Sequence, residues 1–228
     1  MEMEYKLSTL TSEQKTFEEN LKKNETAAQI AFPNERWVNA SSIKLRTDAE
    51  YEIPKNADRI MVAQSRLTPS RGRPAISDND ARTLAKELRQ AGVLTNKGAS
   101  VFILPKMRGV DSRYIPGPDA LVNGSLYEFK TVTGSIGKVE HRFRESRAQG
   151  QNVYIRVMNT NITRGDIIRK LYGVINDPNY TSGYKGNLIF SVRESSIDLV
   201  YYVRISDLKR KKIRGATVKQ LPCRLPRL

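Results

Sequence analysis

Two carboxylates and one amine lie close together in the stretch PDALVNGSLYEFKT, which runs from residue 118 to residue 131. They belong to Asp119, Glu128 and Lys130, and the residues around them are mostly apolar. Burying charges in apolar surroundings costs free energy, so something must offset the repulsion between the two carboxylates. A divalent cation does so, and Mg²⁺ suits such a site because it prefers oxygen ligands and phosphate substrates. The residue types therefore indicate metal-assisted chemistry on a phosphate.

A β-hairpin would bring the three side chains together. Asn123-Gly124 separates two strand-like runs, and Asn-Gly in that position is the strongest short hairpin signal. A two-residue loop pairs Asp119 with Glu128, and directly opposed residues share a face with Cβ atoms about 4.5–5.5 Å apart. Lys130 follows Glu128 by two residues, so strand alternation places it on the same face. The alternative without a metal is a salt bridge from Lys130 to one of the carboxylates on a half-exposed sheet.

The elements around this hairpin follow the order helix, three strands, helix, strand. The first helix begins with an N-cap cluster at Ser77 and is expected to end at Gly92, a C-cap residue. The predicted elements cover residues 77–92, 99–105, 119–122, 125–131, 137–150 and 152–158. Beyond them, the sequence predicts a further helix over residues 163–177 and then two more strands, NLIFSV and IDLVYYVRI.

The motif PD followed by EFK, at residues 118–119 and 128–130, resembles the PD-(D/E)XK nuclease superfamily when it stands on this order of elements. The longer stretch, with a following helix and ESRAQGQNVYIRV, resembles the C-terminal tRNase domains of bacterial contact-dependent growth-inhibition (CdiA-type) toxins and related domains of mobile elements. The resemblance covers residues 78–158, about a third of the chain. It implies an α/β (α+β) fold with a restriction-endonuclease-like αβββαβ core and a mixed sheet. An N-terminal helical or mixed extension and a C-terminal helix with two strands would be added to that core.

The resemblance also implies roles for individual residues. Asp119 and Glu128, with the backbone carbonyl of Phe129, would ligate a divalent metal ion, with Mg²⁺ first and Mn²⁺ or Zn²⁺ as alternatives. Lys130 would orient or activate the attacking water and stabilise the developing negative charge. Relatives carry further catalytic positions on the first helix, directly after the lysine and late in the second helix. In this chain these positions fall on Asp80 (with Glu87 as second choice), Thr131 and Gln149.

The charge of the chain favours a polyanionic partner. Its 39 Lys and Arg against 24 Asp and Glu give a net charge of +15, and neutralising phosphates releases condensed counterions. The candidate nucleic-acid contacts are Arg142, Arg144 and Arg147 on the helix after the hairpin and the block Lys209, Arg210, Lys211 and Lys212. A solvated helix face and a solubilising tail are the alternatives for these groups. His141, the only histidine, could reach a phosphate or donate a proton.

Composition limits the class of protein further. The single cysteine, Cys223, excludes an internal disulfide and a cysteine-rich zinc site. No run of 18 apolar residues predicts a membrane span, and no signal peptide pattern is present, so a cytoplasmic location is expected. The expected organisation is an N-terminal region of unassigned role (1–75), a nuclease domain (76–208) and a basic tail (209–228).

These observations together predict a metal-dependent endonuclease with tRNA favoured over DNA as its substrate. A folded tRNA needs one cut, so a monomer with one site suffices, whereas sequence-specific DNA cutters usually dimerise. A toxin-like nuclease also predicts a small acidic immunity protein as partner. Two alternatives stay open: a DNA endonuclease of a phage or mobile element, and a non-catalytic basic nucleic-acid-binding or phage structural protein.

Overall fold

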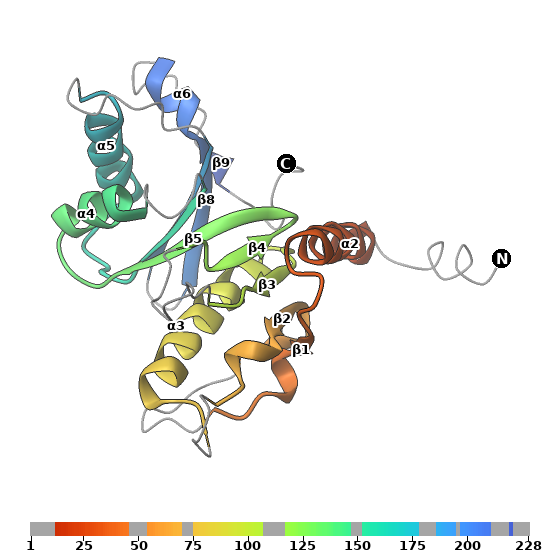
Figure 1. The fold of residues 1–228 in the computed structure, drawn as a ribbon. Helices are drawn as coiled ribbons and strands as arrows, with labels where there is room; N and C mark the ends of the chain where they lie inside the picture. The colour runs from red at the N-terminus through yellow and green to blue at the C-terminus, as the bar shows by residue number, and fades with distance from the viewer. Residues whose placement is uncertain are drawn as a thin grey trace. The chain divides into compact units, whose positions relative to one another are not determined.

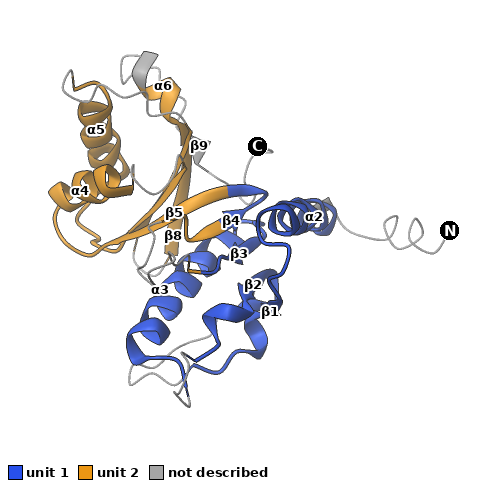
Figure 2. Ribbon diagram, viewed as in Figure 1, with its two compact units in different colours: residues 1–105, 121–125, 223–228 blue, residues 106–120, 126–222 orange. Residues whose placement is uncertain are grey.

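The fold of this chain is mixed α/β, with both parallel and antiparallel strand pairs (Figure 1). The structure is a computed structural model. It describes residues 12–45, 54–69, 75–106, 117–146, 152–177, 186–194, 197–210 and 219–220. The chain divides into two compact units, shown in Figure 2, and each is described below by itself. Unit 1 consists of residues 1–105, 121–125 and 223–228, and unit 2 of residues 106–120 and 126–222.

Unit 1 contains two long helices and a small sheet. Its main elements are α2 (Ser12–Ala31), β1 (Trp37–Asn39), β2 (Ile60–Ala63), α3 (Asp78–Thr95) and β3 (Val101–Ile103). Three short 3-10 helices join them: η1 (Ala40–Ser42), η2 (Ala57–Arg59) and η3 (Gln64–Arg66). Strand β1 pairs antiparallel with β2, and β2 pairs parallel with β3. The domain boundary that the sequence predicts after residue 75 falls inside unit 1, which includes residues 1–105.

Helix α3 begins where the sequence predicts and ends later. Ser77 is the N-cap, and its hydroxyl accepts a hydrogen bond from the Asp80 amide. The expected end at Gly92 is wrong, because the helix continues to Thr95. A Cβ at Gly92 would lie 2.7 Å from the Pro54 Cβ, so this glycine permits close packing inside the helix and does not cap it.

Helix α2 packs onto the turn between β4 (Ala120–Val122) and β5 (Ser125–Val132). The buried Asn24 side chain accepts a hydrogen bond from the Gly124 amide at 2.6 Å and donates to the Ser100 hydroxyl at 3.1 Å. Ser100 in turn donates its amide to the Asn123 side chain at 2.9 Å. These hydrogen bonds hold the turn in place. The residues that form them are far apart in the sequence, so no local sequence pattern predicts the contacts.

Unit 2 is built around a sheet of parallel and antiparallel strands. It contains α4 (Ile136–Ser146), β6 (Val153–Val157), α5 (Arg164–Ile175), β7 (Asn187–Glu194), β8 (Ile197–Arg204), α6 (Ile205–Arg210) and β9 (Lys219–Gln220), together with most of β5. β5, β6 and β7 are parallel, and β8 is antiparallel to β7 and β9. Parallel neighbours need crossover connections, which α4 and α5 supply.

The core of unit 2 lies between these two helices and one face of the sheet. Val139 and Phe143 of α4 and Leu171 of α5 share a buried cluster with Ile155 and Phe190 of the strands. The expected order of helix, three strands, helix, strand is present as α3, β3, β4, β5, α4 and β6. The second helix is described as far as Ser146, and residues 147–150 of its predicted span lie outside the described residues. Within the expected basic tail, two residues form β9 and pair with β8.

Candidate metal and phosphate site

The hairpin turn has the geometry that its sequence predicts. Asn123 and Gly124 have φ angles of 51° and 86°. Both positive values are what a two-residue type I′ turn requires, and asparagine and glycine adopt them at least cost. β4 ends directly before the turn and β5 begins directly after it, so the predicted hairpin is confirmed.

Asp119 lies at the start of this hairpin. It forms hydrogen bonds with the residue before Glu128 and with the residue after it. Its backbone amide donates to the Tyr127 carbonyl at 3.0 Å. Its Oδ2 accepts a hydrogen bond from the Phe129 amide at 2.8 Å. Asp119 is expected directly opposite Glu128, and the structure bonds Asp119 to both neighbours of Glu128. The carboxylates of Asp119 and Glu128 are still brought together, and they interact electrostatically.

Glu128 is the most unusual acidic residue of unit 2, because it is 2% exposed. Its Oε1 accepts a hydrogen bond from Lys130 Nζ at 2.7 Å, whereas its buried Oε2 makes no hydrogen bond within the described residues. The pKa of Glu128 is raised to about 8, first by burial, then by the charge of Asp119 and a hydrogen bond with the Asp119 side chain, while Lys130 acts in the opposite direction. The anionic form of this carboxylate is therefore destabilised by its surroundings.

The ion pair with Lys130 explains only part of this arrangement. The salt bridge that was the alternative without a metal is present, and the Lys130 side chain is 15% exposed. It satisfies one oxygen of Glu128, and the side chain also lies within hydrogen-bonding reach of the Asp119 carboxylate. Two carboxylates that share a site need a proton or a cation between them. A salt bridge alone therefore does not account for the site.

The donors present suit a small cation that prefers oxygen. Asp119 and Glu128 offer two carboxylates. The Phe129 carbonyl points to the same edge of β5 as the Phe129 amide, which donates a hydrogen bond to Asp119. Among the described residues, no three His, Cys, Asp or Glu side chains gather as a metal site. Mg²⁺ commonly binds through one or two carboxylates, with water and substrate phosphate as its other ligands. The paired carboxyl groups of Asp119 and Glu128 provide the oxygen ligands for such a site.

Strand alternation shows which face of the sheet carries the site. Glu128, Lys130 and Val132 point to one face of β5, and Val132 belongs to the core cluster with Val139 and Phe143 of α4. The site therefore lies on the face that α4 covers. Thr131 points to the opposite face and is in register with Arg156 of β6.

The acidic residues expected from the first helix have structural partners in unit 1. Asp80 lies in the first turn of α3, and its Oδ2 accepts a hydrogen bond from the Ser77 hydroxyl at 2.7 Å. Glu87 is buried and bonds Arg66 at 2.6 Å, while Arg66 also donates to the Leu104 carbonyl. Each carboxylate thus stabilises local structure, whether or not it has a second role.

Some of the predicted site residues fall on parts of the chain that the structure does not describe, or describes only as backbone. Gln149, Arg147, Lys211 and Lys212 lie outside the described residues, and Lys209 and Arg210 are described only as the backbone at the end of α6. Arg144 forms ion pairs with Glu140 at 3.0 Å and with Asp177 at 3.5 Å.

The sequence analysis missed one residue, Glu145. It accepts from His141 Nε2 at 3.0 Å and from Arg142 Nη1 at 2.7 Å. Its spacing of three residues from Arg142 and four from His141 is the signal that could have identified it.

Two further findings concern membrane spans and similarity to known proteins. Within the described ranges, no helix combines the length and apolar content that a membrane span requires. The chain was compared with protein-family models, with curated proteins and with solved structures, and none of these comparisons found a match.

Proposed function

We propose that this protein is a metal-dependent endonuclease that hydrolyses phosphodiester bonds in nucleic acid, with tRNA favoured over DNA. The observation that supports this most is the carboxylate of Glu128. It is buried beside a second carboxylate, and Lys130 satisfies only one of its oxygens. A cation between Asp119 and Glu128 would take the place of a shared proton and remove the repulsion between the two anions.

The residues of the site would divide the work of hydrolysis. A divalent cation supplies Lewis-acid polarisation of the phosphate and lowers the pKa of a bound water. Asp119 and Glu128 would hold the cation, helped by the Phe129 carbonyl. Lys130, which is fixed by its 2.7 Å bond to Glu128, would orient the water and stabilise negative charge on the phosphate oxygens as they become more anionic.

The element order and charge support the proposal for different reasons. The order α3, β3, β4, β5, α4, β6, with β5 and β6 parallel, agrees with a restriction-endonuclease-like core. The net charge of +15 favours a nucleic-acid substrate. RNA of compact shape is read largely through its phosphates and surface, which one basic protein with a single site can do. A toxin-like enzyme of this kind would need a small acidic inhibitor in the cell that makes it.

Cleavage of nucleic acid tests the proposal. Purified protein is incubated with total tRNA and with plasmid, in Mg²⁺, Mn²⁺, Zn²⁺ or EDTA. We expect discrete tRNA fragments with metal, none in EDTA, and a loss of about 10²-fold or more in Glu128→Gln. Glu194→Gln, which changes an exposed carboxylate on β7, is the matched control and should cut normally.

Three results would change the proposal. Cleavage that continues after full chelation, or in a folded Glu128→Gln variant, would remove the metal site. Rapid linearisation of plasmid with tRNA untouched would assign the enzyme to DNA. Tight binding of nucleic acid without any cleavage would instead favour a non-catalytic nucleic-acid-binding protein.

A further inference from the structure

Strand β5 is held from both of its edges at the level of Glu128. The backbone groups of successive residues in a strand point to opposite edges. On the β4 edge, Asp119 donates its amide to the Tyr127 carbonyl and accepts from the Phe129 amide. On the β6 edge, the Glu128 amide donates to the Asn152 carbonyl at 3.0 Å. Asp119 belongs to the proposed metal site, and Asn152 holds the other edge from outside it.

Asn152 also joins three parallel strands through its side chain. It lies directly before β6, and its Nδ2 donates to the Leu126 carbonyl of β5 at 2.9 Å. Its Oδ1 accepts a hydrogen bond from the amide of Asn187, the first residue of β7, at 2.9 Å. The side-chain amide thus uses its donor on one neighbouring strand and its acceptor on the other. The strands are tied together next to Glu128.

The hydrogen bonds of Asn152 fix the register of β5 against β6. Glu128 is paired with Val153, and a shift of one residue would turn every side chain of β5 to the opposite face. The groups that Asn152 binds belong to Leu126 and Glu128, which lie two residues apart on the same edge. One residue therefore holds the backbone on both sides of Tyr127 and sets the position from which the Glu128 side chain extends.

A cation between Asp119 and Glu128 would depend on this position. Mg²⁺ demands near-ideal octahedral geometry with short distances to its oxygen ligands. Two carboxylates can meet that demand together only if their backbones keep a fixed separation. Residues that orient a metal ligand without touching the metal contribute about 10- to 100-fold to metal affinity. Asn152 stands in that relation to Glu128.

We infer that Asn152 is a positioning residue for the metal site and acts on Glu128 through the backbone of β5. The inference rests on the proposed function, and it adds to that site a residue that does not itself ligate the cation. An asparagine that only closed the end of the sheet would contribute to stability and leave metal affinity unchanged. Measuring metal affinity and stability in the same variants therefore separates the two roles.

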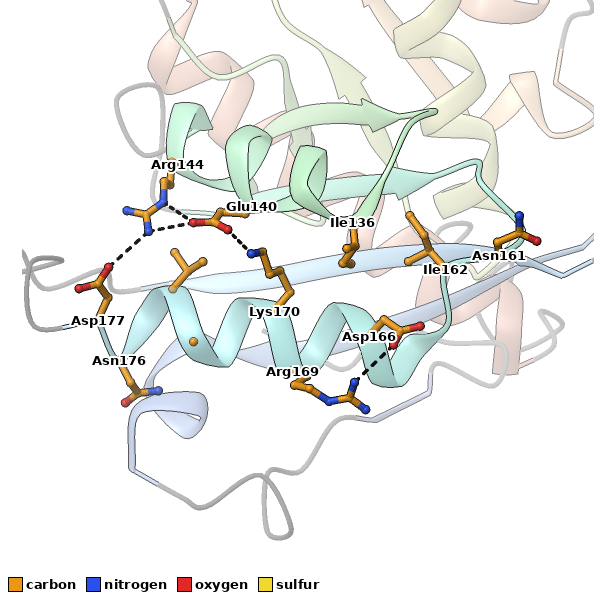
Figure 3. A pocket seen from close by; sticks show the side chains of 12 residues that line it. Ile136, Glu140, Arg144, Asn161, Ile162, Asp166, Arg169, Lys170, Asn176 and Asp177 are labelled. Carbon is orange, nitrogen blue, oxygen red and sulfur yellow. Dashed lines mark hydrogen bonds and ion pairs between the residues drawn. The ribbon is translucent and has the colours of Figure 1, made fainter.

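A matched asparagine lies at the opposite end of β6. Asn159 donates from Nδ2 to the Gly134 carbonyl at 3.1 Å, and its Oδ1 accepts from the Asn161 amide at 2.9 Å. Asn161 lines a groove of about 760 Å³ between α4 and α5 (Figure 3). Each acidic residue that lines this groove pairs with a basic residue, unlike the adjacent carboxylates of the proposed site. Asn159 therefore makes the same kinds of hydrogen bond as Asn152, with β6 between them.

The Mn²⁺ affinities of Asn152→Ala and Asn159→Ala test the inference. Each variant loses one donated and one accepted side-chain hydrogen bond, so their urea midpoints should fall by similar amounts. Electron paramagnetic resonance of free Mn²⁺ then gives the dissociation constant of each folded variant. We expect Asn152→Ala to raise this constant about 10- to 100-fold. Asn159→Ala should stay within about twofold of wild type.

Asn152→Asp separates positioning from charge. Its carboxylate keeps an acceptor for the Asn187 amide and loses the donor to the Leu126 carbonyl. An added negative charge by itself favours a cation, so charge alone predicts tighter Mn²⁺ binding. Positioning predicts the opposite, with binding weakened about 10-fold or more. The same variant provides the readout if Asn152→Ala does not fold.

Cleavage of total tRNA gives a second readout. If Asn152→Ala cuts slowly because it holds the metal weakly, raising the Mn²⁺ concentration should restore kcat toward the wild-type value. The KM for tRNA should stay nearly unchanged, because substrate contacts are intact. Glu128→Gln has lost a carboxylate of the site and should stay inactive at the same Mn²⁺ concentrations.

The possible results separate this inference from the proposed function. Equal Mn²⁺ affinities in Asn152→Ala and Asn159→Ala, or tighter binding by Asn152→Asp, would overturn the role of Asn152. If wild type binds Mn²⁺ and Glu128→Gln does not, the proposed metal site survives that outcome. A wild-type protein that binds no Mn²⁺ at millimolar concentration would overturn both.

Discussion

At the scale of single residues, the central feature is a carboxylate in surroundings that disfavour its charge. Glu128 is buried, its Oε1 accepts a hydrogen bond from Lys130, and the carboxyl group of Asp119 lies beside it within hydrogen-bonding reach. Natural proteins retain such costly arrangements mainly where function needs them. The sequence predicted the three residues and their convergence from the hairpin alone.

The raised pKa of Glu128 predicts how stability depends on pH in the metal-free protein. Its pKa is about 8 in the folded state and 4.5 in its ordinary state, so folding favours the protonated form. That contribution is fully present below pH 4.5 and is lost as pH rises toward 8. Glu128→Gln cannot titrate, so it should gain stability relative to wild type over this range, by at most about 1.4 kcal/mol per pH unit.

Urea unfolding in EDTA at pH 5, 6.5 and 8 measures this difference. Glu194→Gln controls for the loss of any carboxylate, and its curve should run parallel to that of wild type. If wild type and Glu128→Gln also run parallel, the carboxylate is not destabilised as the structure indicates.

At the scale of elements, local patterns predicted the hairpin and the element order, but tertiary contacts decided other features. Asn123-Gly124 carries its own turn signal, whereas its contact with Asn24 joins residues a hundred positions apart. The predicted end of α3 was wrong for a similar reason. Gly92 resembles a C-cap in sequence, and only its contact with Pro54 shows why a glycine is needed inside the helix.

Two helical glycines should respond in opposite ways to alanine. A Cβ at Gly92 would lie 2.7 Å from the Pro54 Cβ, whereas a Cβ at Gly173 of α5 would meet no atom within 4 Å. Gly92→Ala should therefore destabilise the protein by about 1–3 kcal/mol through overpacking. Gly173→Ala should stabilise it by about 0.5–1 kcal/mol, because alanine favours the helix. Thermal and urea unfolding measure both, and equal effects would contradict the difference in packing.

At the scale of the whole molecule, charge and topology favour a polyanionic substrate without specifying it. The +15 charge is a property of composition, and it predicts attraction to RNA and DNA alike. What it cannot predict is which basic residues point toward the site. The arginines of α4 had one common interpretation in the sequence, and the structure distinguishes two of them, because Arg142 pairs with Glu145 and Arg144 with Glu140 and Asp177.

Direct measurement of metal binding tests the central claim most simply. Electron paramagnetic resonance of Mn²⁺ counts the ions bound to each chain and does not depend on knowing the substrate. We predict one Mn²⁺ per molecule in the wild type and in Glu194→Gln, and none in Asp119→Asn or Glu128→Gln at the same concentration. Mn²⁺ binding that is unchanged in the Glu128→Gln variant, or no bound Mn²⁺ in the wild type at millimolar concentration, would contradict the assignment of this site.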